Sequence, residues 1–225
     1  MAGQRADLEW RNGGVPVSTR FDDPYFSLEN GLEETRHVFL DGNGLPGRFT
    51  DGFHVAELGF GTGLNLLATL TDWRESGVAG RLRYTSFEAF PMTADQMIRA
   101  QSAFPALSAL ATELAPFWQN GATRIERSDL DFTLIVGDAR QTLPAWEGCA
   151  DAWYLDGFSP ARNPELWDAD LLAGVGARTA PGGTAATYTA AGFVRRNLAA
   201  AGFDVTRRPG YGRKRHMSVA TRGPR

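Results

Sequence analysis

The stretch VAELGFGTGLN at residues 55–65 decides the fold of this chain. Its apolar run ends at Leu58 and a helix-length amphipathic segment begins at Leu64, which predicts a strand, a glycine turn and a helix. Glycines at positions 59, 61 and 63 let the backbone turn sharply and approach a ligand where a Cβ atom would clash. A dinucleotide fingerprint would place its third glycine at position 64, where this chain has leucine. The loop therefore argues against a nicotinamide dinucleotide site.

On both sides of this unit, short apolar runs alternate with amphipathic segments, a pattern typical of a doubly wound α/β sheet that is mostly parallel. The predicted strands cover residues 53–58, 82–87, 132–136, 152–155, 184–189, 203–206 and 217–221. The predicted helices cover residues 64–75, 93–104, 107–118 and 190–201, and one more follows Pro164. Residues 124–126 and 132–136 alternate around a polar turn, which predicts an inserted β-hairpin.

Residues 1–50 are rich in turn-forming glycine, proline and asparagine, and we expect them to be irregular. Ligands bind at the carboxyl edge of open α/β sheets, so we place this segment as an appendage over that edge. Residues 51–225 form the main domain in this interpretation, and the whole chain forms one compact unit.

Composition excludes several other classes of site. Cys149 is the only cysteine among 225 residues, which excludes an intrachain disulfide and a cysteine-based metal cluster. Three histidines lie far apart in sequence, so we expect no metal. No segment has the length and apolarity of a signal core or of a membrane span. We therefore expect a soluble, cytoplasmic protein that does not bind a membrane.

Charge is distributed unevenly along the chain. The net charge is −3, yet residues 195–225 carry nine arginines or lysines and a single acid, Asp204. Such asymmetry is expected if the C-terminal end contacts a polyanion, although a solvated basic tail would have the same composition.

Acidic residues also stand at the ends of three successive predicted strands. Glu57 lies within the first strand unit, Glu88 follows the second and Asp138 follows the third. A carboxylate at the end of the second strand can accept hydrogen bonds from both ribose hydroxyls of a nucleoside. The acid-x-G-x-G-x-G pattern resembles motif I of class I S-adenosylmethionine-dependent methyltransferases. This resemblance implies S-adenosylmethionine as cofactor and an antiparallel last strand. It also implies cofactor contacts from Glu57, Gly59, Gly61, Thr62, Gly63, Asn65, Glu88, Asp138 and Asp156.

The fourth predicted strand runs into Asp156-Gly157-Phe158-Ser159-Pro160, a loop similar to the catalytic corner of nitrogen methyltransferases. Asp156 can accept a hydrogen bond from an amine and stabilise the positive charge that develops on nitrogen. Phe158 can form a wall of the site beside the cationic centre. A purely structural alternative is an aspartate that caps the turn after the strand.

Several blocks in the same order carry a more specific resemblance. They are LGFGTGLN (58–65), SFEAFP (86–91), LDGFSPARNPELW (155–167), TYTAAGFVRRNLAAAGF (187–203) and YGRKRHM (211–217), with N-terminal blocks at residues 15–18, 21–27 and 38–43. Together they resemble the tRNA 5-methylaminomethyl-2-thiouridine methyltransferases, which comprise the methyltransferase part of bifunctional MnmC and its stand-alone, MnmD-like relatives. The resemblance implies N-methylation of 5-aminomethyl-(2-thio)uridine at the tRNA wobble position 34.

The same resemblance suggests which residues face the tRNA. We expect contacts with the target base or the anticodon stem-loop from Phe21, Asp22, Asp23, Tyr25, Ser27, Arg213, Lys214 and Arg215. Stacking and polar contacts suit an extruded base, and clustered cations suit phosphates. A structural hairpin and a solvated turn are the alternatives for these two segments. We interpret the chain as a stand-alone enzyme without the FAD-dependent oxidase domain, which would receive aminomethyl-uridine directly or from a separate oxidase. The alternative is that the chain is a fragment of the bifunctional enzyme.

Three other functions are compatible with parts of the sequence. One is a methyltransferase that uses S-adenosylmethionine on a small-molecule or protein amine, which the arginine-rich end argues against. Another is a nicotinamide-dependent oxidoreductase, which Leu64 argues against. The third is a non-catalytic RNA-binding module, which would be expected to lack Glu88, Asp138 and Asp156.

Overall fold

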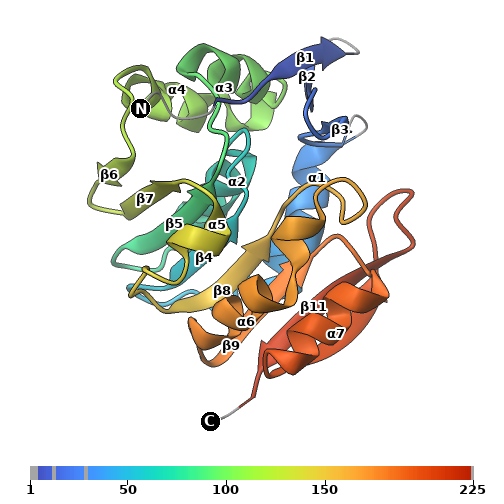
Figure 1. Ribbon diagram of the computed structural model, residues 1–225. Coiled ribbons are helices and arrows are strands. Elements are labelled where there is room, and N and C mark those ends of the chain that lie inside the picture. Colours follow the sequence, from blue (N-terminus) through green and yellow to red (C-terminus); the bar gives the residue numbers. More distant parts are fainter. Residues whose placement is uncertain (1–4, 12–13, 28–29, 224–225) are drawn as a thin grey trace.

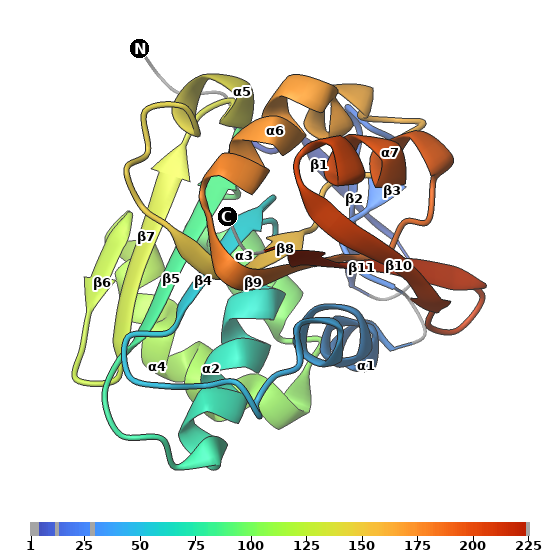
Figure 2. The same cartoon turned by 90° about the horizontal axis from the view of Figure 1, so that it is seen from below.

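A computed structural model of the chain describes residues 5–11, 14–27 and 30–223. Its centre is an eight-stranded sheet with helices on both faces (Figures 1 and 2). The strand order is β10-β11-β9-β8-β4-β5-β7-β6. These strands are β4 (His54–Leu58), β5 (Leu82–Glu88), β6 (Arg124–Glu126), β7 (Leu130–Val136), β8 (Ala150–Leu155), β9 (Thr179–Thr187), β10 (Phe203–Pro209) and β11 (His216–Arg222).

Five neighbouring strands, from β7 through β5, β4 and β8 to β9, run parallel. The last strand, β11, is antiparallel to both β9 and β10, and the short β6 pairs antiparallel with β7 at the other edge. The predicted doubly wound sheet, its antiparallel last strand and the inserted hairpin are therefore confirmed.

The order of the strands reverses at β4, whose neighbours are β5 and β8. Leu58 at the end of β4 pairs with Phe87 of β5 on one side and with Leu155 of β8 on the other. The residues that follow these strands, from Gly59, Glu88 and Asp156 onward, consequently meet at one edge of the sheet. Open α/β sheets bind their ligands at such a reversal, which places the search for a site here.

Two apolar clusters hold helices on opposite faces of the sheet. One cluster contains Leu67 and Leu70 of α2, Met97 of α3 and Leu114 of α4, and the other contains Leu172 of α6 and Val194 of α7. Figure 2 shows the two helical layers above and below the edge of the sheet. The helices are α2 (Leu64–Ser76), α3 (Ala94–Gln101), α4 (Ser108–Gln119), α5 (Ala139–Thr142), α6 (Ala169–Ala177) and α7 (Gly192–Ala200), with short helical turns η3 (Pro105–Leu107) and η4 (Pro164–Trp167).

The expectation of an irregular chain up to residue 50 is wrong for residues 31–43. This segment forms α1 (Gly31–Thr35), η1 (Arg36–Leu40) and η2 (Asp41–Asn43), and Leu32, Val38 and Phe39 are buried in the cluster that contains α2. Helix α1 has only five residues, which is too short a pattern to detect by periodicity. The preceding residues form a small antiparallel sheet of β1 (Leu8–Arg11), β2 (Val15–Ser18) and β3 (Asp23–Pro24).

A second difference concerns the helix predicted after Pro164. That proline starts only the four-residue turn η4, and the main helix α6 begins at Ala169. Asp168 adopts an extended conformation and its Oδ1 accepts a hydrogen bond of 2.7 Å from the Leu171 amide. An aspartate N-cap of this kind fixes the start of a helix more strongly than a proline one turn earlier.

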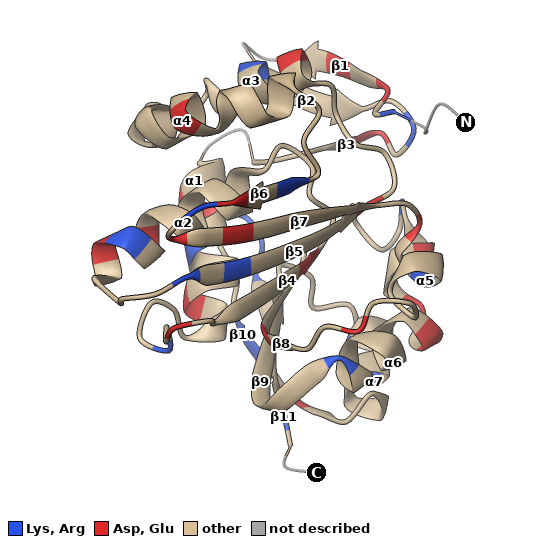
Figure 3. Cartoon of the chain, turned by 90° about the vertical axis from the view of Figure 1, so that its left-hand side faces the viewer, with Lys and Arg blue, Asp and Glu red and all other residues tan. Residues whose placement is uncertain are grey.

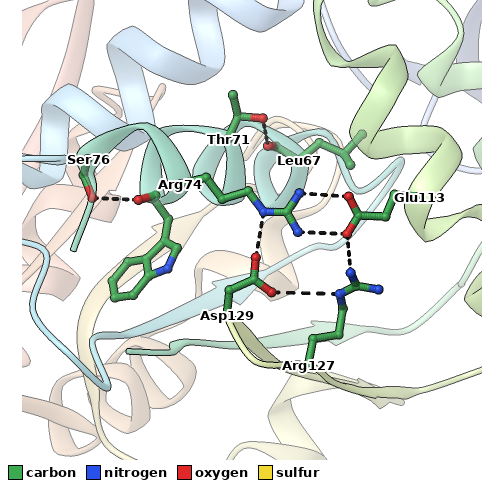
Figure 4. Close-up of polar contacts among 8 residues, drawn as sticks. Leu67, Thr71, Arg74, Ser76, Glu113, Arg127 and Asp129 are labelled. Carbon is green, nitrogen blue, oxygen red and sulfur yellow. Dashed lines mark hydrogen bonds and ion pairs between the residues drawn. The ribbon is translucent and has the colours of Figure 1, made fainter. Parts of the chain in front are cut away.

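An ion-pair network joins α2, α4 and the turn before β7 (Figure 4). Arg74 binds both carboxylate oxygens of Glu113 at 2.8 and 2.9 Å and donates to Asp129 at 2.7 Å, while Arg127 also pairs with Glu113. These hydrogen bonds raise the pKa of Arg74 and lower that of Glu113. Because several partly shielded charges share partners, the network positions the inserted hairpin more firmly than an isolated surface pair would.

No helix among the described residues is long and apolar enough to cross a membrane.

Candidate active site

A cavity of about 1050 Å³ opens at the carboxyl ends of β4, β5, β7 and β8. Its floor contains the glycine loop after β4 and the residues that follow the other three strands. The segment 20–27, helix α1 and the loop between β10 and β11 complete its walls. The cavity therefore lies at the reversal of strand order, where the topology predicts a ligand.

Glycine is required at position 59 by the closeness of the neighbouring loop. Gly59 has a φ of +91°, and a Cβ atom there would lie 2.2 Å from the carbonyl oxygen of Asp156. The backbones after β4 and β8 thus touch at the cavity floor. Further along, Gly63 has a φ of +74° and caps the start of α2. Both conformations are unfavourable for a residue with a side chain.

Glu88 joins the glycine loop to the end of β5. Its Oε2 accepts a hydrogen bond of 2.9 Å from the Gly61 amide, and its Oε1 accepts one of 2.8 Å from the Phe90 amide. Burial raises the pKa of Glu88, and these backbone donors oppose the shift. Glu88 lines the cavity, where its carboxylate can accept a hydrogen bond from a ligand.

Asp138 follows β7 and caps the short helix α5. Its Oδ1 accepts from the Arg140 amide at 2.9 Å, and the Arg140 side chain forms an ion pair with Oδ2 at 2.6 Å. The hydrogen bond from the arginine side chain lowers the pKa of Asp138. Both residues line the cavity, so Asp138 presents an ionised but already paired carboxylate there.

Asn65, in the first turn of α2, connects two carboxylates. Its Nδ2 donates to Oδ2 of Asp156 at 2.7 Å and to Oε1 of Glu57 at 2.8 Å, and its Oδ1 accepts from the Thr35 hydroxyl at 3.0 Å. Ser86 donates to the other oxygen of Glu57 at 2.7 Å. The Asn65 amide therefore fixes the orientation of the Asp156 carboxylate.

Burial is the main cause of unusual acidity in this group. It raises the pKa of Glu57 to about 8, although hydrogen bonds from Ser86 and Asn65 oppose it. It also raises the pKa of Asp156 to about 7, against the hydrogen bond from Asn65 and the charge of Lys214. Asp156 is the member of the pair that lines the cavity. A carboxylate that titrates near neutral pH can exchange a proton under physiological conditions.

Aromatic rings form another part of the cavity wall. The rings of Phe21 and Phe158 stack with centroids 4.7 Å apart, Tyr25 meets Phe158 edge-on at 5.0 Å, and Phe90 lies 6.0 Å from Phe21. Burial raises the pKa of the Tyr25 hydroxyl, so this phenol stays neutral. The wall offers flat apolar faces to a planar ligand.

Two aspartates fasten the N-terminal segment to the loop after β8. Asp23 accepts a hydrogen bond of 2.8 Å from the Ser159 amide, and Asp22 forms an ion pair with Arg162 at 2.5 Å. The hydrogen bond from Arg162 lowers the pKa of Asp22. These contacts hold Phe21 over Phe158, and they use the two aspartates that sequence reasoning assigned to the target base.

The loop between β10 and β11 lies beside α1 (Figures 1 and 2). At the end of β10, the Pro209 carbonyl is 3.1 Å from Nε2 of His37 in η1. Lys214 in this loop forms an ion pair with Glu34 of α1 at 2.7 Å, and its ammonium lies 4.0 Å from the centre of the Tyr188 ring. Tyr188 in turn donates a hydrogen bond of 2.7 Å to the Gly157 carbonyl.

Most of the residues singled out from the sequence meet at this cavity. Its lining includes Phe21, Asp23, Tyr25, Ser27, Gly59, Gly61, Thr62, Asn65, Glu88, Asp138, Asp156, Phe158, Arg213 and Lys214. Four others lie outside the lining, namely Asp22, Glu57, Gly63 and Arg215. Glu57 is fully buried behind Asn65, so its contacts with the cavity run through that amide.

Sequence reasoning missed Glu34, Thr35, Phe90 and Tyr188, which also line the cavity. Glu34 and Thr35 belong to the short helix that the pattern did not reveal. Tyr188 directly follows β9, so its place at a strand end was a usable signal, as it was for Glu88. Among the described residues, no group of three or more histidine, cysteine or acidic side chains is arranged to hold a metal ion.

Comparison with known proteins gives consistent matches. A family model described as S-adenosyl-L-methionine-dependent methyltransferase matches residues 105–223. The chain is 49% identical over 223 residues to the tRNA 5-methylaminomethyl-2-thiouridine biosynthesis bifunctional protein MnmC of Caulobacter vibrioides, a match that covers 96% of this chain and 38% of that protein. A protein of the same name from Aeromonas salmonicida is 44% identical over 236 residues, covering 96% of this chain and 35% of that protein. The chain thus spans less than half the length of these relatives.

Among solved structures, the chain is similar to MNMC2 from Aquifex aeolicus. The TM-score is 0.74 and the sequence identity is 25%, and the match covers 100% of this chain and 74% of that chain.

Proposed function

Since this chain belongs to the S-adenosyl-L-methionine-dependent methyltransferase family, we propose that it methylates the primary amine of 5-aminomethyl-(2-thio)uridine at the wobble position of tRNA. The observation that carries this proposal is the position of Asp156. This carboxylate lines the cavity, is oriented by Asn65 and lies at the end of β8 beside a wall of aromatic rings. The resemblance to proteins named for tRNA 5-methylaminomethyl-2-thiouridine biosynthesis supports the choice of substrate.

The cavity fits S-adenosylmethionine in size and in chemistry. Its volume of about 1050 Å³ exceeds what one nucleoside-sized ligand needs and leaves room for a second planar group. A Cβ atom at Gly59 would meet the backbone beneath it, so the loop presents a close, bare backbone to the ligand. When bound, S-adenosylmethionine supplies a methyl group that its sulfonium already activates for attack by a nucleophile.

We assign the cofactor contacts to residues at the carboxyl ends of β4, β5 and β7. Glu88 accepts hydrogen bonds from the ribose hydroxyls, because its carboxylate lines the cavity and is held in place by backbone amides. Asp138 lies near the adenine, and the glycine loop with Thr62 and Asn65 passes the amino-acid end. Glu57 acts indirectly by holding Asn65. Gly63 acts by allowing α2 to begin at Leu64.

Asp156 accepts a hydrogen bond from the target amine and aligns it for attack. Its pKa of about 7 allows Oδ2 or Oδ1 to hold a proton from the incoming ammonium near neutral pH. The ionised form also stabilises the positive charge that develops on nitrogen. Phe158 forms the adjacent wall and excludes water from the reacting atoms.

The target uracil stacks in the aromatic part of the cavity. Phe21, Tyr25 and Phe158 supply flat faces for a base that has left the anticodon stack. Asp23 and Ser27 border the same space, whereas Asp22 contributes through its ion pair with Arg162.

Arginines near the C-terminal end suit contacts with tRNA phosphates. Residues 195–225 carry nine arginines or lysines and one acid, whereas Figure 3 shows both signs of charge on each of α2, β5 and β6. Arg213 and Arg215 belong to the basic segment and lie at the loop that borders the cavity. Binding through such contacts weakens as salt rises.

The substrate requires a preceding reaction that leaves a primary amine on the uridine. In this proposal a FAD-dependent oxidase activity supplies that amine, and modification of tRNA places the protein in the cytoplasm. The test is labelled-methyl transfer from S-adenosylmethionine to bulk tRNA from a strain that lacks the modification, followed by nucleoside analysis. Label in 5-methylaminomethyl-(2-thio)uridine supports the proposal. Label on an added small amine or a protein, with none on tRNA, would overturn it.

A further inference from the structure

Lys214 is the only lysine in the chain, and every other strongly basic side chain is an arginine. This residue lines the cavity. There its ammonium lies 2.7 Å from Oε1 of Glu34 and 4.0 Å from the centre of the Tyr188 ring. This one alkylammonium thus occupies a place formed by a carboxylate and an aromatic face.

The carboxylate that receives the ammonium is more buried than the lysine that supplies it. The side chain of Glu34 is only 12% exposed and stands on α1, whereas that of Lys214 is 45% exposed and extends from a loop. The hydroxyl of Tyr188 is held by its 2.7 Å hydrogen bond to the Gly157 carbonyl. Among the described residues, Lys214 is the only side chain that forms an ion pair or hydrogen bond with the Glu34 carboxylate. A largely shielded carboxylate needs a cation, so this place is specific for positive charge.

The same place adjoins the catalytic carboxylate. Lys214 lowers the pKa of Asp156 and Glu34 raises it, so both charges lie within electrostatic range of Asp156. Glu34, Tyr188, Asp156 and Lys214 all line the one cavity. An alkylammonium bound by Glu34 and Tyr188 would therefore be next to the group that receives its proton.

We propose that Glu34 and the face of Tyr188 form the subsite that first receives the protonated amine of the target, and that the Lys214 ammonium fills this subsite until the target displaces it. This inference rests on the proposed function, because it takes the target to be a primary alkylamine. A lysine suits the role better than arginine, since a compact ammonium on a flexible stem matches an aminomethyl group and a planar guanidinium does not. Glu34 and Tyr188 thereby become determinants of specificity for the amine.

The single lysine allows a direct test by NMR without turnover. Protein labelled with ¹³C-lysine has one ε-methylene signal, which the Tyr188 ring shifts. We expect this signal to move toward the position of free lysine when 5-aminomethyluridine is added and to stay in place when uridine is added. A lysine signal that stays in place at the highest soluble concentration of 5-aminomethyluridine overturns the displacement.

A matched pair of variants on α1 tests the role of Glu34. Glu34→Gln and Glu33→Gln remove the same charge from adjacent positions, but Glu33 is exposed and does not line the cavity. The readout is the ratio of affinities for two tRNAs that differ only in the aminomethyl group. Loss of a hydrogen bond between charged groups predicts a fall of about tenfold or more in this ratio for Glu34→Gln. We expect Glu33→Gln to keep the wild-type ratio and both variants to keep their affinity for S-adenosylmethionine. Equal ratios in the two variants overturn the proposal.

Lys214→Met separates displacement from phosphate binding. If Lys214 competes with the target amine, its removal raises the affinity ratio of the two tRNAs. If Lys214 binds a phosphate instead, both tRNAs lose affinity equally, and the proposal is overturned. Failure of the proposed function looks different, because wild-type protein would then leave aminomethyl tRNA unmethylated whatever the lysine signal does.

Discussion

The side-chain amide of Asn65 donates a hydrogen bond of 2.7 Å to Asp156. The same nitrogen donates to the fully buried Glu57 at 2.8 Å, so a residue of the glycine-loop unit orients the carboxylate at the end of β8. The side chain of Asn65 thereby connects the cofactor loop to the proposed catalytic corner. We infer that the residue after the glycine loop sets the orientation of the proposed catalytic carboxylate.

Gly59→Ala should destabilise the protein and disrupt the cofactor loop. The new Cβ atom would lie 2.2 Å from the Asp156 carbonyl oxygen in addition to the strain of a positive φ. Gly52→Ala is the matched control, because Gly52 also has a positive φ, of +75°, but open space around its Cβ position. The left-handed conformation alone costs about 1–2 kcal/mol. We expect urea unfolding to show that cost for Gly52→Ala and at least about 3 kcal/mol for Gly59→Ala. Equal losses would contradict the contact.

Glu88→Ala should weaken the binding of S-adenosylmethionine. Loss of a hydrogen bond to a charged group predicts a cost of roughly 1.5–3 kcal/mol, which calorimetry can measure as an increase in the dissociation constant. Glu126→Ala removes an exposed carboxylate that pairs only with Arg124 in the described part of the chain, and it should leave the constant unchanged. An unaltered constant in Glu88→Ala would rule out the ribose assignment.

The rate of methyl transfer should rise with pH through about pH 7. Burial raises the pKa of Asp156 to about 7, so below that pH the carboxyl is protonated and cannot accept a proton from the amine. Asp156→Asn should lower kcat by about 100-fold or more and remove this pH dependence, while the affinity for S-adenosylmethionine stays within about twofold. Single-turnover rates between pH 6 and 8.5 provide the measurement. A wild-type profile that is flat across this range would exclude Asp156 as the proton acceptor.

The free energy of unfolding should fall as pH rises, because the pKa of Glu57 differs between the folded and unfolded states. This pKa is raised from 4.5 to about 8 in the folded state. Between these values the folded protein binds a proton that the unfolded chain has released, so the free energy of unfolding falls as pH increases and levels off above about pH 8.

Glu57→Gln should flatten this dependence, because glutamine does not titrate. Over pH 5 to 8 the free energy of unfolding should change less than in the wild type by an amount on the order of 3 kcal/mol. Urea unfolding at several pH values checks this, with the exposed Glu126→Gln as control. Parallel profiles for Glu57→Gln and wild type would mean that Glu57 is ionised in the folded protein at neutral pH.

The sequence predicted the sheet well because its signals are local. Apolar runs of strand length, the glycine turn after Leu58 and the alternating residues around 128–131 each depend on neighbours in the chain. The resemblance of the motif blocks to a methyltransferase family is likewise confirmed. Helix α1 was missed because it is only five residues long, and Glu34 was missed with it.

Contacts that depend on packing were beyond the reach of the sequence. Glu57 stands in a motif that implies contact with the cofactor. Its side chain is instead fully buried and hydrogen-bonded to Asn65. Successive residues of a strand face opposite sides of the sheet, and the sequence does not show what covers each side. Lys214 belongs to a basic cluster, but the approach of α1 to the loop between β10 and β11 pairs it with Glu34. A lysine that the sequence assigns to phosphate contacts thus forms an ion pair with a residue of the cavity.

The most direct test of the proposed function compares two tRNAs that differ only in the aminomethyl group of one uridine. One carries 5-aminomethyl-2-thiouridine at the wobble position, and the other carries 2-thiouridine there. With labelled S-adenosylmethionine and wild-type protein, we expect one methyl group per molecule of the first tRNA, recovered as 5-methylaminomethyl-2-thiouridine, and none on the second. Equal labelling of both tRNAs, or labelling of neither while S-adenosylmethionine binds, would contradict the assignment of this cavity to the wobble amine.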